Sequence, residues 1–123
     1  MKKLEFTIQL EPKTKKNSSR IVRIGGHYAL IPSKAYVQYE KDMGIYLPKL
    51  KSPIGYPVNV KAVYYRSTMR RCDLTNLHEA LHDALVKYGV LKDDCFSIVR
   101  STDGSRVLVD REHPRTEVTI ERI

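Results

Sequence analysis

The sequence is poor in cysteine and contains no long apolar run. Its 123 residues include two cysteines, too few for the disulfide scaffold of a small secreted domain, so we expect a reducing compartment. No stretch approaches the roughly 18 consecutive apolar residues of a transmembrane helix. Residues 1–5 alternate and do not begin a secretory signal. We therefore expect a cytoplasmic protein without a membrane partner.

Acidic side chains are scarce in the first part of the chain. Residues 1–72 hold 15 basic and 4 acidic side chains, a net charge of +11. Residues 73–123 hold 7 basic and 10 acidic ones, a net charge of −3. A basic surface of this size is typical of a protein that binds a polyanion, most often nucleic acid. Charge alone does not separate this interpretation from a basic surface that only keeps the protein soluble.

The length is that of a single domain, which we place over residues 1–123. Alternating apolar residues predict strands, and a period near 3.6 predicts helices. The predicted strands are 4–10, 20–24, 27–31, 58–66, 96–101 and 117–122, and the predicted helices are 34–47 and 74–88. This order predicts an α+β fold, a single compact domain with a mixed or antiparallel sheet and two main helices.

Local signals mark where several of these elements begin and end. Gly25-Gly26 predicts a two-residue hairpin turn, Ser33 an N-cap, and Gly89 the end of the second helix. The side chains expected in the core are Ala35, Tyr36, Tyr39 and Met43 of the first helix, and Leu77, Leu81, Ala84 and Leu85 of the second.

Carboxylates surround the second predicted helix. They are Asp73 at its start, Glu79 and Asp83 on one face with Asn76, and Asp93 and Asp94 beyond its end. A helix of about 14 residues is roughly 20 Å long. Asp73 and Asp94 therefore meet only if the chain folds back along the helix as a strand beside residues 58–66. Carboxylates brought together in this way suit Mg²⁺, and two such metals assist phosphodiester cleavage.

Each carboxylate also has an ordinary structural explanation. Asp73 alone would be a helix N-cap, and Glu79 and Asp83 would be a solvated helix face. Asp93 and Asp94 would be part of a turn. Taken singly, these explanations are favoured, whereas the order and spacing of the whole set favour a metal site.

Basic residues follow the first predicted strand and also precede Asp73. Such side chains hold phosphates without reading base sequence. Arg70 and Arg71 would attract phosphate to a site that is otherwise repulsively acidic. The expected DNA-binding residues are Lys13, Lys15, Lys16, Asn17, Arg20, Arg23, Lys34, Arg70 and Arg71.

Residues 78–82, His-Glu-Ala-Leu-His, match the H-E-x-x-H signature of zinc proteases. Two such histidines on a helix can hold Zn²⁺ beside a glutamate base. The only later histidine is His113, and no further ligand motif follows. We therefore place His78 and His82 on the helix surface or in a dimer contact, and a small zinc protease is the least favoured alternative.

We assign the two cysteines and two of the tyrosines to packing. Cys72 and Cys95 each adjoin a carboxylate, and neighbouring side chains of an extended segment point to opposite sides, so both thiols are expected in the core. Tyr36 and Tyr39 have helical spacing, which favours the core or a dimer interface. Tyr28 is left as a residue that could stack on unpaired bases.

Several segments together resemble a known family. They are Asp73-Leu74-Thr75-Asn76-Leu77, Asp83-Ala84-Leu85, Gly89-Val90-Leu91 and Asp93-Asp94, with Lys15 to Ser18 and Ser33-Lys34-Ala35-Tyr36 in the first half. The pattern is similar to that of the RusA-type Holliday junction resolvases of bacteria and their phages. The resemblance extends over nearly the whole chain.

The resemblance implies a RusA-like fold and a homodimeric, Mg²⁺-dependent endonuclease, with Mn²⁺ able to substitute. Its substrate would be branched DNA, the four-way junction of recombination and repair. The protein would be encoded by a bacterium or a phage and would be associated with the nucleoid. Metal binding carries over to Asp73 and Asp94, with Asp93 beside them.

The chain departs from the better-known members at two positions. They have a second aspartate where this chain has Thr75, and a lysine where it has Glu79. We infer that Glu79 replaces the missing ligand, so Asp73, Glu79 and Asp94 are the expected catalytic residues. Asp93 is a further metal residue, and Asn76 and Asp83 support the site. Because Thr75 removes a carboxylate, a junction-binding module that has lost catalysis is the alternative.

Overall fold

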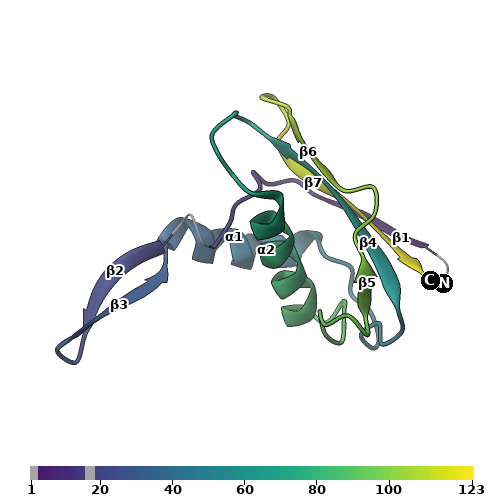
Figure 1. Ribbon diagram of the computed structural model, residues 1–123, viewed down its shortest axis with the longest axis horizontal. Helices are drawn as coiled ribbons and strands as arrows, with labels where there is room; N and C mark the ends of the chain where they lie inside the picture. Colours follow the sequence, from purple (N-terminus) through teal and green to yellow (C-terminus); the bar gives the residue numbers. More distant parts are fainter. Residues whose placement is uncertain (1–2, 16–18) are drawn as a thin grey trace.

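The computed structural model describes residues 3–15 and 19–123, and Figure 1 shows their arrangement. In chain order the elements are β1 (Lys3–Ile8), β2 (Ser19–Ile24), β3 (His27–Pro32), α1 (Lys34–Tyr46), β4 (Val58–Arg66), α2 (Leu74–Lys87), β5 (Val99–Ser101), β6 (Arg106–Val109) and β7 (Arg115–Arg122). The expected α+β fold with two main helices is confirmed.

The larger sheet is mixed. Its strand order is β1-β7-β4-β5, and β7 is antiparallel to both of its neighbours. The short strands β5 and β6 are parallel to β4 and share one of its edges. Val58 pairs with Val99 of β5, and Val63 pairs with Arg106 of β6. β4 and β7 therefore form the middle of the sheet.

Both helices lie on one side of this sheet (Figure 1). Burial alternates along β4, where Val58, Val60, Ala62 and Tyr64 are buried toward the helices. α1 contributes Tyr36, Tyr39 and Met43 to the same core, and α2 contributes Leu77, Ala80, Leu81, Ala84 and Leu85. The apolar stripes predicted for the helices are confirmed except at Ala35, which is exposed.

α2 connects β4 to the parallel strand β5, so the chain does return along the helix, as the site prediction required. The segment directly after α2 forms backbone hydrogen bonds with the segment before β4. The Ile54 amide donates to the Val90 carbonyl at 2.9 Å, and the Lys92 amide donates to the Ile54 carbonyl at 2.9 Å. Residues 93–98 therefore lie near the C-terminal end of α2, before the returning strand begins.

β2 and β3 form a separate two-stranded sheet, an arm that projects from the body in Figure 1. Gly25 and Gly26 have φ values of +54° and +84°, which the tight turn between the strands requires. Ile21, Tyr28 and Leu30 of the arm are 71%, 77% and 70% exposed. An isolated two-stranded hairpin is marginally stable in water, and an exposed apolar surface of this kind is typical of an interaction site.

Several strands differ from the prediction. β1 ends at Ile8, and β5 begins only at Val99, because amides 98 and 99 both bond the Cys95 carbonyl in a turn. β6 was not predicted, since its four residues form a strand only through pairing with β4. The predicted helix cap is confirmed, as the Ser33 hydroxyl accepts from the Tyr36 amide at 3.1 Å. Within the described residues, no helix is long and apolar enough to cross a membrane.

Candidate metal and DNA-binding site

Asp73 stands at the start of α2 but does not cap the helix with its side chain. Its backbone carbonyl accepts from the amides of Asn76 and Leu77, at 3.1 and 3.2 Å. The exposed side chain makes no capping hydrogen bond. Asp73 therefore occupies the N-cap position, as its ordinary explanation requires, but its carboxylate does not cap the helix.

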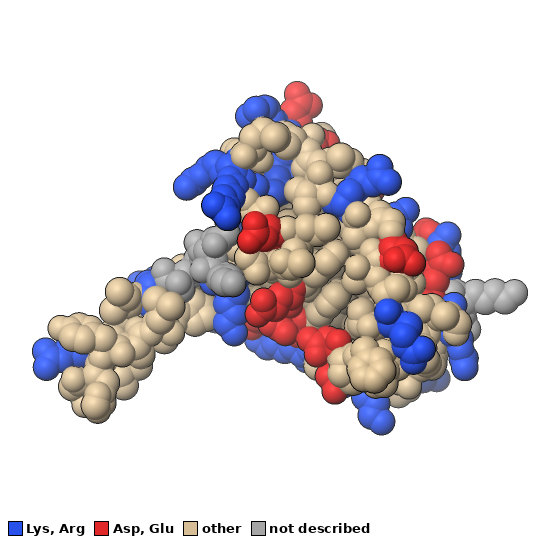
Figure 2. Space-filling view, viewed as in Figure 1, with Lys and Arg blue, Asp and Glu red and all other residues tan. Residues whose placement is uncertain are grey.

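Asp83, in contrast, lies in a cluster of negative charge. Its pKa is raised, first by partial burial and then by the nearby carboxylates of Asp94 and Glu79, while Lys15 opposes the rise. We name Glu79, Asp83 and Asp94 the acidic cluster. Figure 2 shows red acidic side chains following α2, with blue basic side chains on the surface beside them. A divalent cation would relieve the mutual repulsion of these carboxylates.

The acidic cluster also faces α1. The pKa of Tyr36 is raised to about 12, first by burial and then by Glu40, Asp83 and Glu79. The charge of Glu40 is partly balanced, because its carboxylate pairs with the Lys87 ammonium at 2.5 Å. No such ion pair is found for Glu79, Asp83 or Asp94 within residues 3–15 and 19–123.

Asp93 has a turn-forming role. Its Oδ1 accepts from the Asp94 amide at 2.7 Å, and this backbone hydrogen bond is the main cause of the lowered pKa of Asp93. The side chain thus orients the backbone of Asp94. The explanation of Asp93 as part of a turn agrees with this geometry.

Asp73 and the acidic cluster do not come together in the way the sequence predicted. Asp73 precedes the first turn of α2, whereas Asp94 follows the last one. The chain does fold back beside β4, but Asp94 comes before that strand and so stays near Asp83. In the described part of the chain, no three His, Cys, Asp or Glu side chains are close enough to hold one metal ion.

The two histidines of the H-E-x-x-H motif pack inward, so their placement on the surface or in a dimer contact is wrong. Tyr64 Oη and His78 Nδ1 share a hydrogen bond of 2.8 Å, and the rings of His78 and His82 stack at 5.5 Å. Burial lowers the pKa of His78 and lowers that of His82 to about 4. The pair belongs to the packing between α2 and β4.

The expectation for the cysteines is half right. Cys72 packs against the core, and burial is the main cause of its raised pKa. Cys95 is exposed and its sulfur lies 3.0 Å from the Ser97 hydroxyl, because residues 95–98 form a turn and not a strand. The predicted packing of Tyr36 and Tyr39 in the core is confirmed.

The predicted DNA-binding residues that the structure describes fall in four places. Lys13, Arg70 and Arg71 line a cavity of about 300 Å³ next to the start of α2. Lys15 is near Asp83. Arg20 and Arg23 are exposed on the arm, and Lys34 is exposed at the start of α1, whereas Lys16 and Asn17 lie outside the described residues.

Comparison with known families identifies the chain. Residues 9–121 match the family model described as endodeoxyribonuclease RusA. The chain belongs to the RusA family. It is accordingly an endodeoxyribonuclease, a hydrolase that acts on DNA, from a family of Holliday junction resolvases that function in recombination. The comparison with curated proteins returns no match.

Membership of the RusA family removes the zinc protease as an alternative. Sequence reasoning missed three further side chains near the candidate site, Arg66, Thr68 and Phe96. Arg66 and Thr68 line the same cavity as Arg70, and Phe96 is 80% exposed two residues after Asp94. Arg66 closes a strand and Phe96 alternates with polar neighbours, so both resembled ordinary strand residues.

Proposed function

We propose that this RusA-family enzyme cuts four-way DNA junctions with a divalent cation, Mg²⁺ or Mn²⁺, held by carboxylates along α2. One observation carries the proposal: Asp94 and Glu79 lie close enough for their charges to act on Asp83, and none of the three carboxylates forms an ion pair within the described residues. Carboxylate oxygens are the donors that these hard cations prefer, and an uncompensated group of them is suited to a cation.

The spacing along α2 assigns the carboxylates different positions. Glu79 and Asp83 are one turn apart and share a helix face, so both can reach one cation. Asp73 is six residues before Glu79, roughly 9 Å along the helix axis. Because Mg²⁺–oxygen distances are about 2.1 Å, Asp73 and Asp83 cannot share one ion in this arrangement. Glu79 lies between Asp73 and Asp83 along α2, so it is the carboxylate that connects their two positions.

The proposed catalytic residues are therefore Asp73, Glu79 and Asp94, and Asp83 becomes a fourth metal-binding candidate instead of a supporting residue. Asp93 holds the turn that presents Asp94. Cation binding would require the exposed Glu79 and Asp94 side chains to turn toward Asp83. When bound, the cation supplies Lewis-acid activation of water and neutralises charge at the phosphodiester, leaving 5′-phosphate and 3′-hydroxyl ends.

The proposal includes a homodimer. A two-fold symmetric pair would present two acidic clusters, which matches the approximate two-fold symmetry of a four-way junction. The exposed apolar side chains Ile21, Tyr28 and Leu30 of the arm support a contact with a second copy. β2 and β3 pair only with each other among the described strands, so the single chain leaves these residues uncovered.

A cleavage assay on a synthetic four-way junction with a mobile core tests the proposal. Cleavage is expected in Mg²⁺ and in Mn²⁺, and none in EDTA. Asp83→Asn should abolish cleavage or raise the Mg²⁺ requirement, whereas Asp103→Asn, an exposed control in the connection between β5 and β6, should cut normally. Junction binding without cleavage by the unaltered protein at any metal concentration would instead establish the alternative, a binding module without catalysis.

A further inference from the structure

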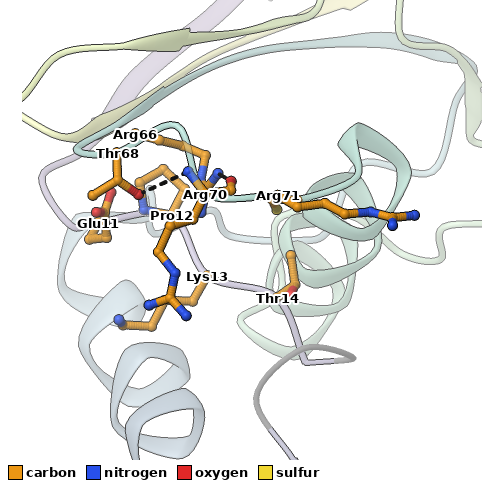
Figure 3. A pocket seen from close by; sticks show the side chains of 9 residues that line it. Glu11, Pro12, Lys13, Thr14, Arg66, Thr68, Arg70 and Arg71 are labelled. Carbon is orange, nitrogen blue, oxygen red and sulfur yellow. Dashed lines mark hydrogen bonds between the residues drawn. The ribbon is translucent and has the colours of Figure 1, made fainter.

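A cationic cavity lies between two connections that are far apart in the sequence. The connection from β1 forms one wall, and the connection from β4 to α2 forms the other (Figure 3). The lining residues are Glu11, Pro12, Lys13, Thr14, Arg66, Thr68, Arg70, Arg71 and Cys72. We call this cavity the basic pocket. Its volume of about 300 Å³ is ample for a phosphate group.

The charges of the basic pocket are unbalanced. It has four cationic side chains and a single carboxylate, Glu11. Both oxygens of Glu11 accept from the Ser67 amide, at 3.2 and 3.1 Å, and one also accepts from the Ser67 hydroxyl. These hydrogen bonds hold the β4–α2 connection, which carries Ser67, against the connection from β1, which carries Glu11. Within residues 3–15 and 19–123, none of the four cations takes part in an ion pair.

Arg66 provides an independent sign that the pocket suits an anion. Its Nη1 donates to the Arg70 carbonyl, which holds the guanidinium in place. Its Nε–H is buried and has no hydrogen-bond acceptor among the residues that the structure describes. A buried donor of a charged group without an acceptor costs free energy, so such donors are normally paired. An anion in the pocket would supply the acceptor.

The arrangement of donors fits a phosphate. In Figure 3 the side chains of Arg70 and Lys13 extend toward each other on one side of the pocket, with Arg66 held above them at the Arg70 backbone, whereas Arg71 extends away. Guanidinium groups present paired N–H donors that match phosphate oxygens. Thr68 Oγ1 already accepts from the Arg70 amide at 3.3 Å, so its own hydroxyl proton is free for an acceptor.

We propose that the basic pocket binds one backbone phosphate of the DNA strand that enters the acidic cluster, through Arg66, Arg70 and Lys13. This rests on the proposed function. The pocket adjoins Cys72, the residue before Asp73, so a phosphate here lies next to the start of α2. Because the acidic cluster repels DNA, an anchor at the start of the helix that carries Glu79 and Asp83 holds the strand against that repulsion.

The test combines a protein variant with removal of one phosphate charge. Junctions carry a single neutral methylphosphonate at successive positions around the cut, and binding is measured in EDTA, so that cleavage is not needed. Arg70→Gln should weaken binding of the normal junction about tenfold, and one methylphosphonate position should do the same to the unaltered protein. Together they should weaken binding no further than either alone, since both remove the same contact.

Arg111→Gln is the matched control, because it removes the same charge from an exposed loop outside the pocket. Its effect should add to that of every methylphosphonate. If Arg70→Gln is also additive at every position, the pocket holds no DNA phosphate and the proposal is overturned. If coupling is found but no metal supports cleavage, the proposed function fails and the pocket assignment stands.

Inorganic phosphate separates the two sources of such an anion. One outcome is that millimolar inorganic phosphate raises the thermal stability of the unaltered protein but not of Arg70→Gln, and that no methylphosphonate position is coupled to Arg70→Gln. This outcome would show a site for free phosphate and would overturn the DNA assignment. A methylphosphonate position that is coupled to Arg70→Gln supports the DNA assignment. Arg70 is exposed, so Arg70→Gln leaves the core intact, and Arg66→Lys, which keeps the charge but lacks the Nε–H donor, should show the same coupled position.

Discussion

The role of Glu79 can be decided by a single substitution, Glu79→Gln. The change keeps the size of the side chain and removes its charge. Glu79 is exposed on α2, one turn before Asp83, and its charge contributes to the raised pKa of Asp83. The substitution should therefore weaken cation binding and also lower the pKa of Asp83 toward the ordinary value.

The size of the effect follows from the exposure of Glu79. Two unit charges about 4 Å apart in water interact by ~1 kcal/mol, and a divalent ion doubles this to about 2 kcal/mol. Every 1.36 kcal/mol or so is a factor of ten, so the loss corresponds to roughly 30-fold in affinity for the ion. Water takes the place of the lost carboxylate ligand and recovers part of the lost affinity for the ion. We therefore expect cleavage at limiting Mg²⁺ to fall at least about tenfold.

The assay is single-turnover cleavage of a four-way junction across a Mg²⁺ titration. Glu112→Gln, an exposed glutamate far along the chain from α2, is the matched control and should behave like the unaltered enzyme. The pKa of Asp83, followed by NMR without metal, gives a readout that does not depend on catalysis. An unchanged Mg²⁺ requirement with an unchanged Asp83 pKa would refute the reasoning and return Glu79 to a solvated helix face.

Three further predictions concern stability and assembly. Because the pKa of Asp83 is raised in the folded protein, its ionisation costs stability as pH rises through that pKa, so metal-free Asp83→Asn should be more stable at pH 7 in urea unfolding; a less stable variant would contradict this. The pKa of His82 is lowered to about 4, so stability should fall as pH drops from about 6.5 to 4, by up to about 3 kcal/mol, and His82→Phe should flatten that dependence; parallel curves would contradict the burial argument. Ile21→Ser with Leu30→Ser should shift sedimentation from dimer toward monomer without lowering the melting temperature of the body, whereas Ile123→Ser, equally apolar and exposed, should not; an unchanged dimer would place the interface elsewhere.

Patterns within one segment were sufficient for most of the fold. The alternation along β4 predicted which side chains face the helices, and the spacing of Leu77, Leu81 and Leu85 predicted the buried face of α2. Ser33 and Gly89 marked helix ends because capping depends on only a few neighbouring residues. The order of carboxylates around α2 was also enough to reveal the resemblance to the family.

What depends on distant segments could not be read in this way. β6 exists only through its pairing with β4, and Cys95 is exposed because its segment turns before β5 begins. His78 and His82 have a metal-binding spacing, yet their rings pack against Tyr64 and the core. For β6 and for the two histidines, the neighbour that decides the outcome is far away in sequence.

The candidate site shows the same division. The sequence by itself determined the supply of carboxylates and basic side chains and the helix that carries Glu79 and Asp83. Only the tertiary structure decided that Asp94 lies with Asp83 and not with Asp73, and that Arg66 and Lys13 share a pocket. The physical reason is that local periodicity sets which side of an element is buried, whereas the pairing of elements sets which side chains meet across the gap between them.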